Sequence, residues 1–241
     1  MVTVALIHGL AASKLHWEPL LPYLNHFNIV NFEIPGHGGS KSLNFFDWES
    51  IVSELHKNVS KSDRVIYVLH SFAAALLPEI IKKSKQCDRI IIIEGIIHLD
   101  DAKWTKSLTF LDEFTFENWV KKFKFGARVA LKLQLVKKHN KSDIDLWSTS
   151  FADVDAHAIR ILSRNFVERL RKMEISDSLF SHQKNIVFLK GEKSNLSKSC
   201  MNILKKSNVE LVNIDNSGHF PMLDNPKDVS KVIESVINDL E

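Results

Sequence analysis

Short apolar runs recur along the chain, and each gives way to a polar or glycine-containing stretch. Runs of this length, many of them rich in Val and Ile, are typical of buried β-strands. We therefore predict a strand at each of them. The runs are Val2–Ile7, Asn28–Phe32, Arg64–Leu69, Arg89–Ile93, Ile186–Leu189 and Glu210–Ile214.

Between most of these runs, apolar residues recur at helical spacing, which predicts helices with one buried face. Strands that alternate with helices form a parallel sheet with helices on its faces. The predicted fold class is therefore α/β, with a mostly parallel, helix-covered sheet. The helical stretches are Leu15–Leu24, Asp47–Asn58, Phe72–Ser84, Leu196–Lys206 and Asp228–Leu240.

The alternation stops after Gly95 and resumes near Ile186. The intervening stretch carries helical patterns without a clear strand. We interpret residues 97–181 as a helical cap inserted into a core that comprises residues 1–96 and 182–241. The aromatic residues of this cap either line an apolar pocket or pack the cap onto the core, and they include Trp104, Trp119 and Trp147.

Composition adds few constraints to this picture. A chain of 241 residues with 44% hydrophobic residues can bury one large core, so one domain with an insertion is expected. The 32 basic and 29 acidic residues nearly balance, and the lysines spread over predicted surface helices. This distribution gives no reason to expect a nucleic-acid partner.

The cysteines and the N-terminal run bear on location. Cys87 and Cys200 are far apart in sequence, which suits a reducing compartment, and we expect the cytoplasm. The run in "MVTVALIHGL" is short and β-branched, so it predicts a core strand rather than a leader. No stretch is long and apolar enough to predict a membrane span.

Ser71 lies where the strand of "VIYVLH" gives way to a helix. A serine on such a turn is a nucleophile elbow, usually written Gly-x-Ser-x-Gly because small residues let strand and helix approach closely. Here Ala73 takes the second glycine position, and the bulky Leu69 takes the first. The alternative is a serine that only caps the helix beginning at Phe72.

A serine nucleophile also needs a base and donors for the oxyanion. His8 and Gly9 directly follow the first strand, so the backbone N–H groups of Leu10 and Phe72 are the expected oxyanion donors. His219 lies just after the last strand and is the expected base. Serine first and histidine last is the chain order in which these groups occur on such sheets.

These pieces together resemble the α/β-hydrolase superfamily, in particular its small cap-bearing esterases. The resemblance covers nearly the whole chain outside the cap, and it implies that Ser71 is the nucleophile and His219 the general base. The matching motifs are His8-Gly9, Pro35-Gly36-His37-Gly38, the elbow Leu69-His70-Ser71-Phe72-Ala73, "FLKGE" at Phe188–Glu192, and Gly218-His219-Phe220-Pro221.

The acid departs from the family pattern. The superfamily usually carries an aspartate three residues after the glycine that ends the penultimate strand, and counting from Gly191 reaches Ser194. A neutral hydroxyl cannot stabilise an imidazolium as a carboxylate does. Glu94, at the end of the strand after the elbow helix, is similar in place to the glutamate of haloalkane dehalogenases. Glu192, Asp100 or no carboxylate at all are the alternatives.

The resemblance implies a serine hydrolase that cleaves a carboxylic ester or thioester of a small to medium acyl group through an acyl-serine. The acyl group could be linked to a coenzyme or a carrier protein. Two alternatives stay open. One is a cofactor-free lyase or C–C hydrolase, since "IEG" at the strand end resembles the menaquinone-pathway lyase. The other is a degenerate ligand-binding protein, which Leu69 and Ser194 motivate.

Signals for metals and cofactors are missing from the sequence. The eleven histidines form no cluster with ligand spacing, and "PGHGGS" lacks the Lys-Ser/Thr pair of a phosphate-binding loop. We therefore expect chemistry by side chains alone, on a small-molecule substrate. His37, His70 and His98 are expected to brace loops or line the pocket. The oligomeric state does not follow from the sequence.

Overall fold

A parallel sheet lies at the centre of the computed structural model, which describes residues 2–40, 46–84, 87–151 and 153–240. The strand order is β2-β1-β3-β4-β5-β6, and every neighbouring pair is parallel. The predicted strands and the α/β fold class are confirmed. The strands are β1 (Val2–Ile7), β2 (Asn28–Phe32), β3 (Arg64–His70), β4 (Cys87–Ile93), β5 (Ile186–Gly191) and β6 (Glu210–Ile214).

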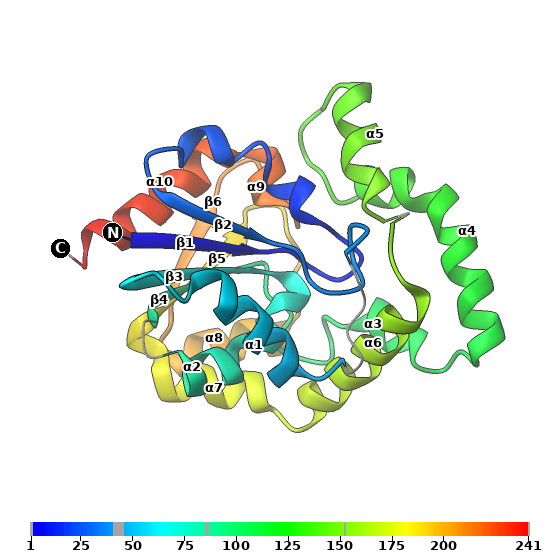
Figure 1. Cartoon of the computed structure of the whole chain (residues 1–241), viewed down its shortest axis with the longest axis horizontal. Coiled ribbons are helices and arrows are strands. Elements are labelled where there is room, and N and C mark those ends of the chain that lie inside the picture. Colours follow the sequence, from blue (N-terminus) through cyan, green and yellow to red (C-terminus); the bar gives the residue numbers. More distant parts are fainter. Residues whose placement is uncertain (1, 41–45, 85–86, 152, 241) are drawn as a thin grey trace.

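Helices cover both faces of this sheet (Figure 1). The central strands are buried on both faces, which explains why their sequences are continuously apolar. Because all strands run parallel, their carboxyl ends meet at one edge of the sheet. One face carries α1 (Trp48–Val59), α2 (Leu77–Lys83), α7 (Glu174–His182) and α8 (Lys198–Ser207), and the other carries α10 (Pro226–Asn238) with two short 3₁₀ turns, η1 and η2.

The helix predicted at Leu15–Leu24 is wrong. The structure has two separate 3₁₀ turns there, η1 (Lys14–Trp17) and η2 (Leu21–Tyr23). Pro22 explains the break, because proline has no N–H to donate and its ring clashes with the preceding helical turn. The apolar residues of this stretch nevertheless pack into the core, since Trp17, Leu20 and Leu24 are fully buried.

Four helices between β4 and β5 lie beyond the carboxyl edge of the sheet, at the end of the molecule towards which the strands point (Figure 1). The described residues of this insertion contain no strand, apart from a single bridge between His37 and Val154. The following α7 packs against α2 and α8. The bounds 97–181 for the cap remain a prediction. The four helices are α3 (Lys103–Leu108), α4 (Glu113–Lys132), α5 (Lys141–Thr149) and α6 (Ala156–Arg171).

Three of these helices begin at a polar residue that caps the first turn. Asp112, Asn140 and Asp155 each accept a hydrogen bond from the backbone N–H three residues later. Such caps satisfy donors that the first helical turn leaves without partners. The α6 helix is also anchored to the core, because the buried Arg169 pairs with Glu79 of α2.

None of the helices in the described residues combines the length and the apolar character that a membrane crossing requires. The cytoplasmic location and the absence of a nucleic-acid partner stay predictions.

Candidate active site

Ser71 lies on a sharp turn between β3 and a 3₁₀ helix, η3 (Ser71–Leu76). Its φ of 54° is in the left-handed region, which costs free energy for any residue with a Cβ. Gly9 in the neighbouring turn leaves room for Ser71 because it has no side chain. A Cβ at this position would lie only 3.2 Å from the Cβ of Ser71, which is a tight contact. Leu69, which replaces the usual small residue, is a fully buried strand residue. Ser71 is therefore held where its side chain borders a cavity.

His219 approaches Ser71 from the loop between β6 and α9 (Pro221–Asp224). Its Nε2 atom is 3.0 Å from Ser71 Oγ, within hydrogen-bonding distance. The two residues are 148 positions apart in the chain and meet because their loops follow strands of one parallel sheet. This is the contact a base needs in order to take a proton from a serine hydroxyl.

Glu94 lies on the other side of His219, directly after β4. Its carboxylate is fully buried, and Oε2 lies 3.4 Å from His219 Nδ1. Oε1 accepts a hydrogen bond of 2.7 Å from the N–H of Gly191. Ser194 Oγ, at the position where the family usually carries its acid, donates to Oε2 at 2.5 Å. Ser194 thus contacts the carboxylate instead of supplying one.

The other two candidate acids lie at the surface. Glu192 pairs with Lys193 at 2.6 Å and accepts from the N–H of Asn216 at 2.9 Å. Asp100 accepts a hydrogen bond from Ser199, and more than half of its side chain is exposed. The structure therefore brings Glu94, and neither of these carboxylates, beside the imidazole of His219.

The two expected oxyanion donors also lie near Ser71. Leu10 follows Gly9 in the loop after β1, and Phe72 is the first residue after Ser71 in η3. Both residues border the same cavity as Ser71 and His219. Their backbone N–H groups thus belong to the two segments that meet at the elbow.

The comparisons with known proteins agree with this geometry. The model of the alpha/beta hydrolase family matches residues 4–232, which is almost the whole chain. This chain belongs to the alpha/beta hydrolase family. A Haemophilus influenzae protein, provisionally named 2-succinyl-6-hydroxy-2,4-cyclohexadiene-1-carboxylate synthase, is 24% identical, and the match covers 98% of each chain.

Solved structures share the fold of this alpha/beta hydrolase at low sequence identity. An esterase from Exiguobacterium antarcticum superposes with a TM-score of 0.80 at 14% identity, over 99% of this chain and 92% of that chain. The epoxide hydrolase CorEH superposes with a TM-score of 0.78 at 16% identity, over 100% of this chain and 93% of that chain. These likenesses show the fold alone, because the family hosts several chemistries.

The cavity of this hydrolase has a volume of about 560 Å³ and lies between the carboxyl edge of the sheet and the cap. Its wall has more apolar than polar surface. Trp104 is among the lining residues, whereas Trp119 stacks on Phe123 behind the wall and Trp147 is buried within the cap. Both readings of the cap aromatics therefore apply, to different residues. The apolar lining from the cap includes Trp104, Phe123, Leu133, Leu135, Val136 and Phe151.

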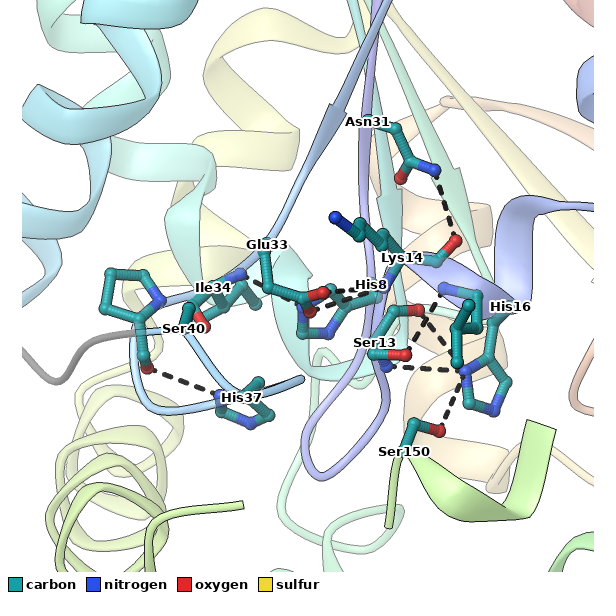
Figure 2. A network of polar contacts seen from close by, with 12 residues as sticks. His8, Ser13, Lys14, His16, Asn31, Glu33, Ile34, His37, Ser40 and Ser150 are labelled. Carbon is teal, nitrogen blue, oxygen red and sulfur yellow. Dashed lines mark hydrogen bonds and ion pairs between the residues drawn. The ribbon is translucent and has the colours of Figure 1, made fainter. Parts of the chain in front are cut away.

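A network of polar contacts fixes the loop that carries Leu10 (Figure 2). His8 Nδ1 is 2.8 Å from the carbonyl oxygen of Gly9, and its Nε2 is 2.7 Å from Glu33 Oε1. His37 lies next to His8, with 5.2 Å between their ring centroids. The expectation that His37 braces a loop agrees with this placement. Ser13 and His16 continue the network towards the cap.

His70 connects the elbow to the base. Its Nε2 donates a hydrogen bond of 2.9 Å to the backbone carbonyl of His219, and the residue also borders the cavity. Burial, with a further contribution from the nearby His219, holds the pKa of His70 well below its usual range. A neutral His70 therefore fixes the backbone position of His219.

We expect the free energy of unfolding to fall as the pH drops below about 6.5. Burial lowers the pKa of His16 and His37 to about 3, and that of His70 is also lowered. The unfolded chain then binds more protons than the folded chain, so between pH 7.5 and 5.5 the three histidines together should cost about 4 kcal/mol. Urea unfolding at these two pH values measures the change.

Two variants test whether the buried histidines cause this pH dependence of the unfolding free energy. His37→Asn should remove about a third of it, because one buried histidine no longer titrates in the unfolded chain. His182→Asn, at an exposed position, should leave the dependence unchanged. An unfolding free energy that is equal at both pH values would contradict the burial of neutral histidines.

Asp224 is a buried carboxylate that sequence reasoning missed. It accepts hydrogen bonds from the N–H groups of Val136 and Lys137, at 3.1 Å and 3.0 Å, and it lies 3.2 Å from His139 Nε2. It also accepts from the N–H of Gly218 at 2.9 Å. One side chain thus holds the cap segment beside the cavity and the residue that precedes His219.

Asp224→Ala should destabilise the protein by about 3 kcal/mol or more, because it leaves several buried N–H groups without an acceptor. Urea unfolding gives this value, and faster tryptic cleavage near Lys137 and Lys138 would show that the cap segment has loosened. Asp228→Ala is the matched control at a partly exposed carboxylate, with an expected cost below about 1 kcal/mol. Equal costs for the two variants would argue against the anchoring role of Asp224.

Among the described residues, no group of three or more His, Cys, Asp or Glu is arranged to hold a metal ion.

Proposed function

We propose that this alpha/beta hydrolase is a serine esterase that cleaves a carboxylic ester or thioester of a small to medium acyl group. The observation that carries the proposal is the line of contacts from Ser71 Oγ to His219 Nε2 and from His219 Nδ1 to Glu94 Oε2. A hydroxyl, an imidazole and a buried carboxylate in this order form a nucleophile, a base and the group that orients the base.

In the proposed mechanism, Ser71 Oγ attacks the carbonyl carbon while His219 Nε2 takes the hydroxyl proton. The N–H groups of Leu10 and Phe72 stabilise the resulting oxyanion. His219 then returns the proton to the leaving alcohol or thiol, and an acyl-serine remains. Water attacks the acyl-serine with His219 again as base, which releases the acid and restores Ser71. Glu94 stabilises the imidazolium in both halves of the reaction.

The cavity favours an acyl group that is neutral and apolar. Its cap side is formed by aromatic and aliphatic side chains, and its volume of about 560 Å³ suits a small-molecule ligand. Apart from histidines, Lys193 is the only cation among the described lining residues, and it already pairs with Glu192. Glu94 and Asp101 add two carboxylates to the lining.

A lyase or C–C hydrolase is the second candidate, and the name of the Haemophilus influenzae relative favours it. That name contains a succinyl and a carboxylate group, both of which are anionic at neutral pH. A cavity lined by two carboxylates and a single paired lysine gives such an anion little electrostatic stabilisation. The charges of the cavity therefore support the esterase over this alternative.

A degenerate binding protein is the third candidate. Leu69 and Ser194 motivated it, because each departs from the family pattern. Leu69 is accommodated in a buried strand, and Ser194 donates to a carboxylate that lies beside His219. Both departures therefore have a structural account that is compatible with the proposed catalytic groups.

The experiment that tests the proposal is labelling with a fluorophosphonate, followed by mass spectrometry of tryptic peptides. One adduct on Ser71 is the expected result, together with turnover of p-nitrophenyl esters over a series of acyl lengths. A folded protein with an unlabelled Ser71 would contradict the serine esterase. Labelling of Ser71 without ester turnover would favour the lyase, because the serine would be activated but the substrate would be different.

A further inference from the structure

The positive charge of the chain is concentrated in one segment of the cap. Residues 118–141 contain eight of the 32 Lys and Arg residues and none of the 29 Asp and Glu residues. Outside this segment the chain therefore has more acidic than basic residues. The expectation that the lysines are scattered and not gathered in one place does not hold for this part of the cap, which comprises most of α4 and the stretch that leads to α5.

This basic segment forms part of the cavity mouth. Leu133, Leu135 and Val136 border the cavity, and Lys132, Lys137 and Lys138 flank them in sequence. We refer to residues 132–138 as the lip. Leu133 is 82% exposed and Val136 is 42% exposed, so the lip presents apolar side chains between its lysines.

Five lysines of this segment are available to a partner. Among the described residues, no carboxylate forms an ion pair with Lys121, Lys122, Lys132, Lys138 or Lys141. The lip itself is held in place, because Asp224 accepts the N–H groups of Val136 and Lys137. A fixed basic surface with unpaired lysines is suited to attract an anionic partner by its electrostatic field.

We propose that the lip and α4 dock an acidic carrier protein that presents its acyl group on a flexible arm. The inference rests on the proposed esterase function and names the partner that delivers its substrate. Ser71 is only 7% exposed at the base of the cavity, so a protein docked at the lip cannot bring its own surface to Oγ. An acyl group on an extended arm can reach through the mouth.

The extent of the charged surface favours a protein over a free coenzyme. The cations of α4 run from Lys121 to Lys132, about 17 Å along the helix, and they continue beyond it to Lys141. The phosphates of one coenzyme would meet only a part of this span. A membrane surface is favoured less, because among the described side chains of residues 118–141 the exposed large apolar ones are Val129, Leu133 and Val136, a small area for insertion.

The test measures binding and turnover separately. A bacterial acyl carrier protein, loaded with octanoyl on its phosphopantetheine thiol and labelled with a dye, is titrated with the hydrolase and followed by fluorescence anisotropy. The triple variant Lys132→Glu, Lys138→Glu and Lys141→Glu should weaken binding by about tenfold or more at low salt, and about 0.5 M salt should narrow this difference. Hydrolysis of p-nitrophenyl butyrate should stay within about twofold, because none of these lysines borders the cavity.

The matched control changes the same number of charges at the opposite edge of the sheet. The control is the triple variant Lys61→Glu, Lys205→Glu and Lys206→Glu. These lysines are exposed and lie near the beginnings of β3 and β6. This control variant should bind the loaded carrier as the wild type does. Octanoyl-pantetheine, which has the same thioester without the protein, should be cleaved equally by the wild type and both variants if thioesters are substrates.

The outcomes separate this proposal from the proposed function. If the wild type and the triple variant of Lys132, Lys138 and Lys141 bound the carrier equally, or did not bind it at all, the proposed docking surface would be wrong. The proposed esterase function would be unaffected if ester turnover were still observed. Binding that depends on the lip in a protein without ester turnover would support the surface and contradict the esterase. A third outcome would assign the surface to a membrane instead. In that case the wild type binds vesicles of phosphatidylglycerol but not the carrier, and the triple variant of Lys132, Lys138 and Lys141 no longer binds the vesicles.

Discussion

Ser71→Ala should abolish ester turnover, with a fall in kcat on the order of 10⁵-fold or more, because the acyl-enzyme can no longer form. The fold should persist, since alanine has the same Cβ and Ser71 contributes no hydrogen bond beyond the site, apart from its backbone. Steady-state hydrolysis of a p-nitrophenyl ester gives the rate, and fluorophosphonate labelling reports the same loss independently. Circular dichroism verifies that the variant is folded.

Ser207→Ala is a suitable control for this variant. Ser207 is also buried, and its hydroxyl donates to the carbonyl of Leu204 on α8, away from the cavity. Its loss should leave turnover unchanged. If Ser71→Ala retained the rate of the wild type, the hydrolysis would have to come from another group, and the acyl-serine mechanism would be wrong.

Glu94→Gln should lower kcat by about 10³- to 10⁴-fold, because an amide cannot stabilise the imidazolium of His219 as a carboxylate does. The substitution keeps the size of the side chain, and its amide oxygen can still accept the N–H of Gly191. The expected loss is therefore in catalysis more than in folding. The KM for the ester should change little, since Glu94 lies behind His219.

A second substitution tests whether the carboxylate can be moved. In the double variant Glu94→Gln and Ser194→Asp, a carboxylate returns at the place where the family usually carries its acid, and part of the lost activity should return with it. Recovery by at least tenfold over Glu94→Gln is the expected result. Wild-type activity in Glu94→Gln alone would show that His219 needs no acid from this position.

The parts of the fold that the sequence predicts well are those whose cause is local. A strand covered on both faces must be continuously apolar, so Arg64–Leu69 and Arg89–Ile93 could be recognised without knowledge of their neighbours. Ser71 and His219 could be found for a related reason, since each follows a strand of a parallel sheet and such positions meet at one edge. The helix at Leu15–Leu24 failed because one proline outweighed a helical pattern.

The parts that the sequence could not settle depend on contacts between distant segments. The resemblance alone pointed to Glu94, with Glu192, Asp100 or no acid as alternatives, and the proximity of Glu94 to His219, which is 125 positions away, could be seen only in the structure. Asp224 gave no local signal, because its N–H donors at Val136 and Lys137 are 88 and 87 positions away. An aspartate near a helix end is common, and nothing in its own neighbourhood indicates that it is buried.

The anchoring of the lip by Asp224 limits how this enzyme can be re-engineered. Caps of related hydrolases are natural modules to exchange when a new specificity is wanted, and the chain connections suggest cutting after β4 and before β5. Here such a graft would remove the cap partners of Asp224 at Val136 and Lys137 and leave a buried carboxylate bonded only to the core, at the N–H of Gly218, one residue before His219. A working chimera should therefore transfer residues 217–224 together with the cap, although they are distant in sequence.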